Sequence, residues 1–158
     1  MIFESPSQIK KIKNNTFYLC SSLTYISIPL AVTSIGDNAF CFCTYLKQID
    51  VPTCLVHIGN NAFKECNSLK IISFEQKDAQ KEEQISLPPS LVTIRSSAFS
   101  KCTSIENVLI PSSIKTIGKF AFENCTSLKK IFVPSSKKSI INLDQVGLQK
   151  NIVQIIEY

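Results

Sequence analysis

Apolar residues return along this chain in a unit of 23 residues that opens on a proline. The unit reads roughly Pro-x-x-Ile-x-x-Ile-x-x-x-Ala-Phe-x-x-Cys-x-x-Leu-x-x-Ile-x-Val, and copies begin at Pro6, Pro29, Pro52, Pro88 and Pro111. A period of this length is typical of a solenoid, in which each unit buries its apolar edge only by stacking on its neighbours. We therefore predict a single repeat domain that spans residues 1–158.

Each position of the unit keeps its chemistry from copy to copy. The third and sixth residues after the proline are aliphatic, and the eleventh is a phenylalanine that follows a small residue. The phenylalanines are Phe17, Phe40, Phe63, Phe99 and Phe122, and the cysteines at the fourteenth position are Cys20, Cys43, Cys66, Cys102 and Cys125. Because strands of such a stack lie about 4.8 Å apart, we expect each set of equivalent side chains to form a ladder inside the molecule.

The end of each unit, Leu-x-x-Ile-x-Val-Pro, alternates apolar with other residues as a strand does, and the proline closes it. Gly36, Gly59 and Gly118 indicate a chain reversal earlier in the unit. The Ala-Phe-x-x-Cys stretch is too short for a long helix. The predicted fold is an α/β repeat solenoid with one short parallel strand per turn and short helical or 3₁₀ turns on the other side.

The repeat is interrupted after its third copy and again at its end. Residues 75–87 (EQKDAQKEEQISL) form an insertion that is hydrophilic and lacks aromatic residues. This composition favours a surface loop, with a dedicated binding finger as the alternative. Residues 135–158 lose the Ala-Phe and Cys positions, and Ile152, Ile155 and Ile156 predict a closing strand. We interpret residues 135–158 as a degenerate capping repeat.

The first copy opens without a capping segment, since residues 2–5 resemble the tail of a preceding strand. Tyr18, Leu19, Cys41 and Phe42 add apolar bulk at positions that are mostly Lys, Glu or Ser in later copies. Exposed strand edges and uncapped apolar faces tend to pair. We predict either self-association through these N-terminal turns or an upstream region that covers them, and the upstream region is the favoured of the two.

The run IPSSIKTIGKFAFENCTSLKKIFVP, residues 110–134, resembles the BspA-type leucine-rich repeat, and the resemblance extends over residues 6–134. It implies a curved leucine-rich-repeat solenoid with a right-handed superhelical path. Families of this type occur in mucosal protozoan parasites and anaerobic bacteria, and their characterised members are similar to adhesins or protein-binding modules. The resemblance therefore implies binding rather than a reaction, and it carries over no catalytic residues.

In such solenoids the strands line the concave side, so the two outward positions of each predicted strand are candidates for contact with a protein ligand. These positions hold Tyr25, Ser27, Gln48, Asp50, Ile71, Ser73, Asn107, Leu109, Lys130 and Phe132. A mixture of aromatic, aliphatic and polar side chains is expected of an interface core with a polar rim. A partly solvated sheet face without a partner is the alternative.

The chain has seven cysteines, which raises the question of disulfides and metal sites. The five in the repeat are expected to be buried free thiols that act as small apolar side chains. Cys41 and Cys54 fall at variable positions and are predicted to be the exposed, reactive thiols. An odd number of cysteines favours a reducing compartment. A zinc site is disfavoured because the single histidine, His57, lies at an outward position.

Nucleotide-binding, zinc-protease and serine-hydrolase motifs are absent from the sequence, and we predict neither catalysis nor a cofactor. The few acidic residues are interpreted as solvated surface charge. The formal charge of +5 is spread along the chain, which has a single arginine, Arg95. This pattern disfavours a dedicated nucleic-acid groove. No apolar run reaches the 18 or so residues needed to span a membrane.

The favoured function is a protein-interaction scaffold, with a cell-surface adhesin fragment as the alternative. A nucleic-acid or regulatory role inside the cell is a third hypothesis. The N-terminus MIFESPSQIKK lacks the charged and then apolar order of a secretory signal. Together with the free cysteines this favours an intracellular location for the chain as given, and a surface location if it is part of a longer exported protein.

Overall fold

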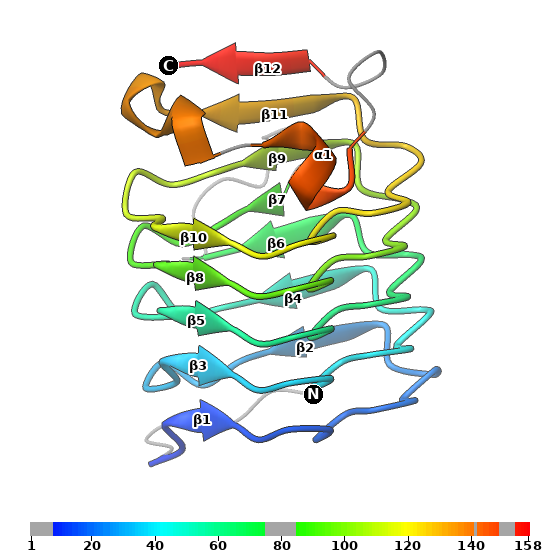
Figure 1. Ribbon diagram of the computed structural model, residues 1–158. Coiled ribbons are helices and arrows are strands. Elements are labelled where there is room, and N and C mark those ends of the chain that lie inside the picture. Colours follow the sequence, from blue (N-terminus) through cyan, green and yellow to red (C-terminus); the bar gives the residue numbers. More distant parts are fainter. Residues whose placement is uncertain (1–7, 75–84, 141, 149–153) are drawn as a thin grey trace.

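The computed structural model describes residues 8–74, 85–140, 142–148 and 154–158. Within these residues the chain winds into a solenoid whose turns stack along one axis and whose strands are parallel (Figure 1). Residues 2–5, Pro6, Ile152 and residues 75–84 of the insertion lie outside the described part of the chain.

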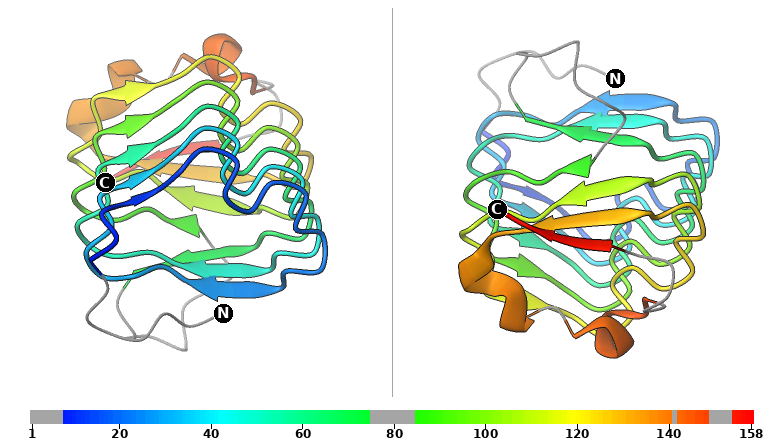
Figure 2. Two further views of the ribbon diagram at one scale, coloured as in Figure 1. Left: turned by 90° about the horizontal axis from the view of Figure 1, so that it is seen from below. Right: turned by 90° about the horizontal axis from the view of Figure 1, so that it is seen from above.

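Two parallel sheets follow two sides of the stack (Figure 2). The larger, in the order β12-β11-β9-β7-β6-β4-β2, comprises β2 (Tyr25–Ser27), β4 (Gln48–Asp50), β6 (Ile71–Ser73), β7 (Ile85–Ser86), β9 (Asn107–Leu109), β11 (Lys130–Val133) and β12 (Gln154–Glu157). The smaller, in the order β1-β3-β5-β8-β10, comprises β1 (Lys11–Ile12), β3 (Ser34–Ile35), β5 (His57–Ile58), β8 (Thr93–Ile94) and β10 (Thr116–Ile117). We call them the seven-stranded and the five-stranded sheet.

The five copies therefore contain two strands each, where the sequence predicted one. The strand that was not predicted comes first in each copy and belongs to the five-stranded sheet. It has two residues and ends on the isoleucine at the sixth position after the proline, which is at most 5% exposed in every copy. A strand of two residues shows no alternation, so the hydrophobic period could not reveal it.

The stretch around each phenylalanine is a series of hydrogen-bonded turns, and the predicted helical or 3₁₀ turn is not confirmed there. The ninth and thirteenth residues after each proline adopt left-handed φ between 51° and 63°. They are Asn15, Leu19, Asn38, Phe42, Asn61, Glu65, Ser97, Lys101, Phe120 and Asn124. A right-handed helix requires negative φ at each residue, so the two left-handed residues limit any right-handed segment between them to three residues.

Neighbouring turns are joined on this side by stacked rings and backbone hydrogen bonds. The Phe40 N–H, for example, donates to the Ala62 carbonyl at 2.8 Å. Ring centroids of successive phenylalanines are 5.0 to 5.5 Å apart, and the ring planes differ by at most 10°. The predicted phenylalanine ladder is thus continuous from Phe17 to Phe122.

The inward side chains form one apolar cluster along the stack. The phenylalanines of the second to fifth copies are at most 1% exposed. The first copy is less well covered, because only one of its faces meets a described neighbour: Ile9 is 41% exposed, and Phe17 and Leu23 are only partly buried.

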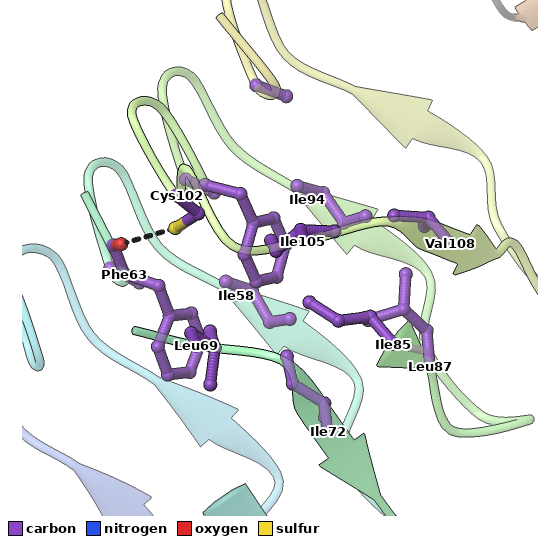
Figure 3. Packing of buried hydrophobic residues seen from close by; sticks show 14 of the residues in the cluster. Ile58, Phe63, Leu69, Ile72, Ile85, Leu87, Ile94, Cys102, Ile105 and Val108 are labelled. Carbon is purple, nitrogen blue, oxygen red and sulfur yellow. Dashed lines mark hydrogen bonds between the residues drawn. The ribbon is translucent and has the colours of Figure 1, made fainter. Parts of the chain in front are cut away.

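The end of the insertion is a core strand, so the prediction of a surface loop is wrong for residues 85–87. Ile85 pairs with Ile72 on one side and with Val108 on the other. Ile85 and Leu87 are at most 2% exposed and point into the same cluster as these neighbours (Figure 3). The physical reason is that Ile85-x-Leu87-Pro88 repeats the Ile-x-Val-Pro ending of a unit, although the residues that should precede it are missing.

The C-terminal segment adds the 3₁₀ helix η1 (Ser135–Ile140), the short helix α1 (Leu143–Val146) and strand β12. The carbonyls of Gln145 and Val146 accept the N–H groups of Phe120 and Phe122 at 2.8 and 3.0 Å. Val146 and Leu148 are buried against the last turn. At this end of the stack, two backbone donors of the last turn and its core side chains are therefore covered.

Candidate interaction surfaces

The outward side chains of the seven-stranded sheet lie in two rows that cross its strands, and we call this surface the strand face. The first row is Tyr25, Gln48, Ile71, Asn107, Lys130 and Gln154, and the second is Ser27, Asp50, Ser73, Ser86, Leu109, Phe132 and Ile156. All ten predicted contact residues thus lie on one face. Sequence reasoning missed Ser86, Gln154 and Ile156 because β7 and β12 fall outside the regular spacing.

Asp50 collects hydrogen bonds at the N-terminal end of the strand face. The Tyr25 hydroxyl donates to its Oδ2 at 2.6 Å, the Gln48 side-chain amide donates to its Oδ1 at 2.9 Å, and the Ser73 hydroxyl also donates to Oδ1. The donors come from β2, β4 and β6, so this carboxylate links three adjacent strands. The interpretation of every acidic residue as solvated surface charge is wrong for Asp50.

The same contacts shift two pKa values. Partial burial raises the pKa of the Asp50 carboxyl, but the hydrogen bonds from Ser73, Tyr25 and Gln48 outweigh it and leave the pKa below its ordinary value. The hydrogen bond to Asp50, and then burial, raise the pKa of the Tyr25 hydroxyl. Asp50 is therefore ionised and Tyr25 protonated at neutral pH, which is the combination the network needs.

The second row changes from polar to apolar halfway along the stack. Its first four members are polar, whereas Leu109, Phe132 and Ile156 on β9, β11 and β12 are large and apolar. We call these three residues the apolar strip. Each is half-buried by its sheet neighbours and keeps part of its surface exposed. Contiguous apolar side chains within a polar surround have the composition of an interface core.

Lysines lie beside the apolar strip. Lys129 forms an ion pair with Glu106 at 2.8 Å, and its hydrogen bond is the main reason that the pKa of Glu106 is lowered. Lys130 is exposed on the strand face two residues before Phe132. It forms no ion pair with any residue of the described part of the chain. An acidic group of a partner would therefore compete with no carboxylate of the described residues for Lys130.

The residues predicted for self-association lie on the turn side of the first two copies. Tyr18 and Leu19 are 44% and 58% exposed, and the Tyr18 and Phe42 rings meet edge to face with centroids 6.0 Å apart. The expectation that Cys41 is exposed here is wrong, since it is 3% exposed. Cys41 lines a surface hollow of about 310 Å³ together with residues that include Tyr18, Phe42 and Lys64.

The interior cysteines are hydrogen-bond donors as well as small apolar groups. The thiols of Cys43, Cys66, Cys102 and Cys125 donate to the phenylalanine carbonyl of the preceding turn at 3.0 to 3.1 Å. Figure 3 shows the bond from Cys102 to Phe63. Burial raises the pKa of Cys43 and Cys125 to about 12. These groups therefore stay protonated and can donate at neutral pH.

Two further cysteines differ from the prediction. Cys20, expected inside, is exposed because no described turn lies beneath it. Cys54, expected to be reactive, is partly buried, and its thiol donates to two carbonyls of the preceding turn at 3.1 and 3.3 Å. Ser90 and Ser113 make similar bonds from the same position of later copies. Cys54, Ser90 and Ser113 are each the second residue after the proline of their copy. The serines at this position could have indicated from the sequence that the Cys54 side chain faces a neighbouring turn.

The described residues contain no cluster of three or more His, Cys, Asp or Glu side chains that could hold a metal ion. They also contain no helix of the length and apolarity needed to cross a membrane.

Comparison with protein families gives a match to the BspA type leucine rich repeat region, in six copies, over residues 2–83 and 77–145. A leucine-rich repeat protein of T. pallidum is 33% identical, with a TM-score of 0.73, and the match covers 84% of this chain and 57% of that one. A leucine-rich repeat protein from Bacteroides ovatus ATCC 8483 is 29% identical, with a TM-score of 0.73 and coverage of 99% and 37%.

A leucine rich cell surface protein from Faecalibacterium prausnitzii A2-165 is 30% identical, with a TM-score of 0.63 and coverage of 85% and 32%. The chain thus spans 57% or less of the length of these three structures. None of the curated proteins matches it. Because the family model covers most of the sequence and the solved relatives share its stacked strands, this chain belongs to the BspA type leucine rich repeat family.

Proposed function

We propose that this protein is a non-enzymatic scaffold that binds a protein ligand on the strand face. The apolar strip, with Lys130 beside it exposed and in no ion pair with the described residues, is the observation that carries the proposal. Membership of a leucine-rich repeat family supports a binding role. The right-handed path and the concave shape of this side, expected from the family resemblance, remain predictions.

The two halves of the strand face are suited to different roles. In the N-terminal half the Asp50 carboxylate already accepts hydrogen bonds from its own neighbours, so it offers little to a ligand. In the C-terminal half Leu109, Phe132 and Ile156 retain exposed apolar surface that a partner could desolvate. Binding energy at interfaces is concentrated in a few such residues near the centre. We therefore place the ligand over the apolar strip, with an acidic side chain directed at Lys130.

A selection of random peptides displayed on phage, with the intact chain as bait, tests this function. The comparison variant carries Leu109→Ala and Phe132→Ala, and the matched control carries Thr116→Ala on the exposed face of the five-stranded sheet. We expect selected peptides to combine apolar residues with Asp or Glu. Their affinity for the comparison variant should fall on the order of tenfold or more, as for the loss of central interface residues.

Peptides that bind the comparison variant and the intact chain equally well would place binding elsewhere. Thermal unfolding of all three proteins shows whether a loss of affinity reflects a loss of folding. The variant Lys130→Gln measures the electrostatic contribution of Lys130 to peptide affinity. This contribution should weaken as the salt concentration increases, because the charge is exposed.

A cell-surface adhesin fragment is the second candidate function. One solved relative is described as a leucine rich cell surface protein, which favours this alternative. An intracellular location remains our first proposal because the seven cysteines form no disulfide among the described residues. Biotinylation of intact source cells with a reagent that cannot enter them distinguishes the two, since only a surface protein is labelled before lysis.

A further inference from the structure

The hollow of about 310 Å³ on the turn side is lined mainly by two rows of side chains from the first three copies. The ninth position after the proline contributes one asparagine from each turn, Asn15, Asn38 and Asn61. The twelfth position contributes Tyr18, Cys41 and Lys64. Because the cysteine side chain is shorter than those of the tyrosine and the lysine on the adjacent turns, this row is lowest at the second copy.

The hollow opens to the side of the stack rather than to one of its ends. The turn side, at the right of Figure 1, runs along the stack axis, and the lining residues belong to three successive turns. A further turn at either end would continue the two rows and would not lie across them. The geometry of the hollow therefore comes from the described turns themselves.

The three asparagine side chains are available to a ligand. Their backbone N–H groups donate to the next turn at 2.8 to 3.0 Å, whereas their carboxamides form no hydrogen bond with another described residue. Ser97 and Phe120 adopt the same left-handed conformation at the ninth position of later copies, so the backbone does not by itself require asparagine. A carboxamide both donates and accepts hydrogen bonds, as a hydroxyl group does. Three carboxamides on adjacent turns suit a ligand with several hydroxyl groups.

An aromatic pair and a lysine complete the lining. The rings of Tyr18 and Phe42 meet edge to face with centroids 6.0 Å apart, and Tyr18 is exposed. The electron-rich face of an aromatic ring attracts the weakly positive C–H groups of a sugar ring. Lys64 forms no ion pair with any described residue, so no carboxylate of that part of the chain competes for its ammonium group.

The size and charge of the hollow narrow the class of ligand. Its volume of about 310 Å³ is at the lower end of the range for small-molecule sites, about 300–1,000 Å³, and suits a short saccharide. Phosphate groups are commonly held by several free backbone N–H groups. Here the N–H groups of the asparagine row are already bonded, and the lining contains a single lysine. A ligand with one carboxylate therefore fits better than a phosphate ester.

We propose that this hollow binds a saccharide that carries a carboxylate. The carboxylate pairs with Lys64, the ring hydroxyls bond to the carboxamides of the asparagine row, and the C–H face of the sugar lies against Tyr18. The site is separate from the strand face, so it adds a second ligand to the function proposed above. It gives Tyr18 and Phe42 a role that needs no second copy of the chain.

Nuclear magnetic resonance of the isotope-labelled intact chain tests the proposal, because it follows the side-chain amide groups of asparagine directly. The probes are the methyl glycosides of glucuronic acid and of glucose, which differ only in a carboxylate or a hydroxymethyl group. We expect the glucuronide to shift the amide signals of the asparagine row saturably. Its affinity should exceed that of the glucoside on the order of tenfold, because hydrogen bonds to charged groups are stronger than neutral ones.

Two further conditions test each half of the ligand. Added salt should reduce the difference between the two glycosides, because Lys64 is partly exposed and its charge is screened. Cyclohexanecarboxylate, which has the carboxylate but no hydroxyl group, should bind more weakly than the glucuronide.

Matched variants locate the site. Lys64→Gln should give both glycosides the same affinity, whereas Lys119→Gln, at an exposed lysine of the fifth copy, should preserve the difference. Asn38→Ser should weaken both glycosides on the order of threefold, as for one neutral hydrogen bond, and Ser97 shows that serine is compatible with this conformation. Asn124→Ser is the control, because Asn124 is exposed and left-handed but lies outside the hollow.

Cys41→Tyr should abolish binding of both glycosides, because it fills the hollow with a side chain that the twelfth position accepts in the first copy. Binding that persists in this variant would place the saccharide elsewhere and overturn the proposal. Absence of saturable shifts in the asparagine row up to the solubility limit of the glucuronide would also overturn it. Equal affinities of the glucuronide and the glucoside would exclude the carboxylate, and equal affinities of the glucuronide and cyclohexanecarboxylate would exclude the saccharide.

Discussion

Ten residues on the turn side adopt a left-handed backbone, and they are not equally suited to it. Asn15, Asn38 and Asn61 occupy the ninth position of the first three copies, and asparagine tolerates this conformation better than other residues with a β-carbon. Phe120 has the same place in the fifth copy, with a φ of 59°, and the residue is 46% exposed. Its backbone conformation is therefore strained without a compensating burial of the ring.

Replacing Phe120 with Asn should stabilise the protein. A left-handed conformation costs an ordinary residue about 1–2 kcal/mol, so we expect the free energy of unfolding in urea to rise by about 1 kcal/mol. Tyr45→Asn is the control, because Tyr45 is exposed and has no left-handed φ. If both variants change stability alike, removal of an exposed aromatic ring rather than backbone strain is the cause.

At the scale of the element, β7 shows how little sequence is needed to add a strand. Ile85 is fully buried between Ile72 and Val108 although the segment before it has no recognisable copy of the unit. Ile85→Ala should lower the free energy of unfolding by about 2–5 kcal/mol, because it removes apolar contacts and leaves a cavity. Leu30→Ala, at a site that is 81% exposed, should change stability little. A small effect of Ile85→Ala in urea unfolding would mean that β7 frays in solution.

The link between β2, β4 and β6 should make stability depend on pH. The pKa of Asp50 is lower in the folded chain than its ordinary value of about 3.9. Its contribution is therefore complete above that ordinary value and is lost as pH falls through the lower folded-state pKa. Unfolding free energies measured from neutral pH into the acid range should fall less steeply for Asp50→Asn than for the unaltered chain. Parallel slopes would show that Asp50 contributes no such linkage.

The elements that could be predicted are those with long, regular patterns. The Leu-x-x-Ile-x-Val-Pro endings predicted the five regular strands of the seven-stranded sheet, β2, β4, β6, β9 and β11, and with them ten positions that share one face. The strands of the five-stranded sheet, such as β1, are too short to show a period. The left-handed corners also escaped notice, although asparagine at the ninth position of three copies was a usable signal. Hydrogen bonds such as Tyr25 to Asp50 cannot be read from spacing, because they depend on where side chains of different turns meet.

For the whole molecule, β7 and β12 make the seven-stranded sheet longer than the five-stranded sheet, and β7 does so within the stack. Between the third and fourth copies the five-stranded sheet passes directly from β5 to β8, whereas the seven-stranded sheet passes from β6 through β7 to β9. Each strand adds about 4.8 Å, so these two copies are one spacing further apart on the strand face. The stack should bend at this point toward the five-stranded sheet. β7 therefore acts as a wedge in the solenoid.

Deleting residues 75–87 should remove this wedge and keep the fold. Joining Phe74 to Pro88 restores the 23-residue spacing and lets Ile72 pair directly with Val108, so no cavity remains where Ile85 and Leu87 were. We expect this deletion of 13 residues to cost less unfolding free energy than the single change Ile85→Ala, which keeps the wedge but leaves a void within it. Urea unfolding compares the two variants, and X-ray scattering measures the straightening of the deleted form. A deletion variant that unfolds more easily than Ile85→Ala would show that the stack depends on β7 for more than spacing.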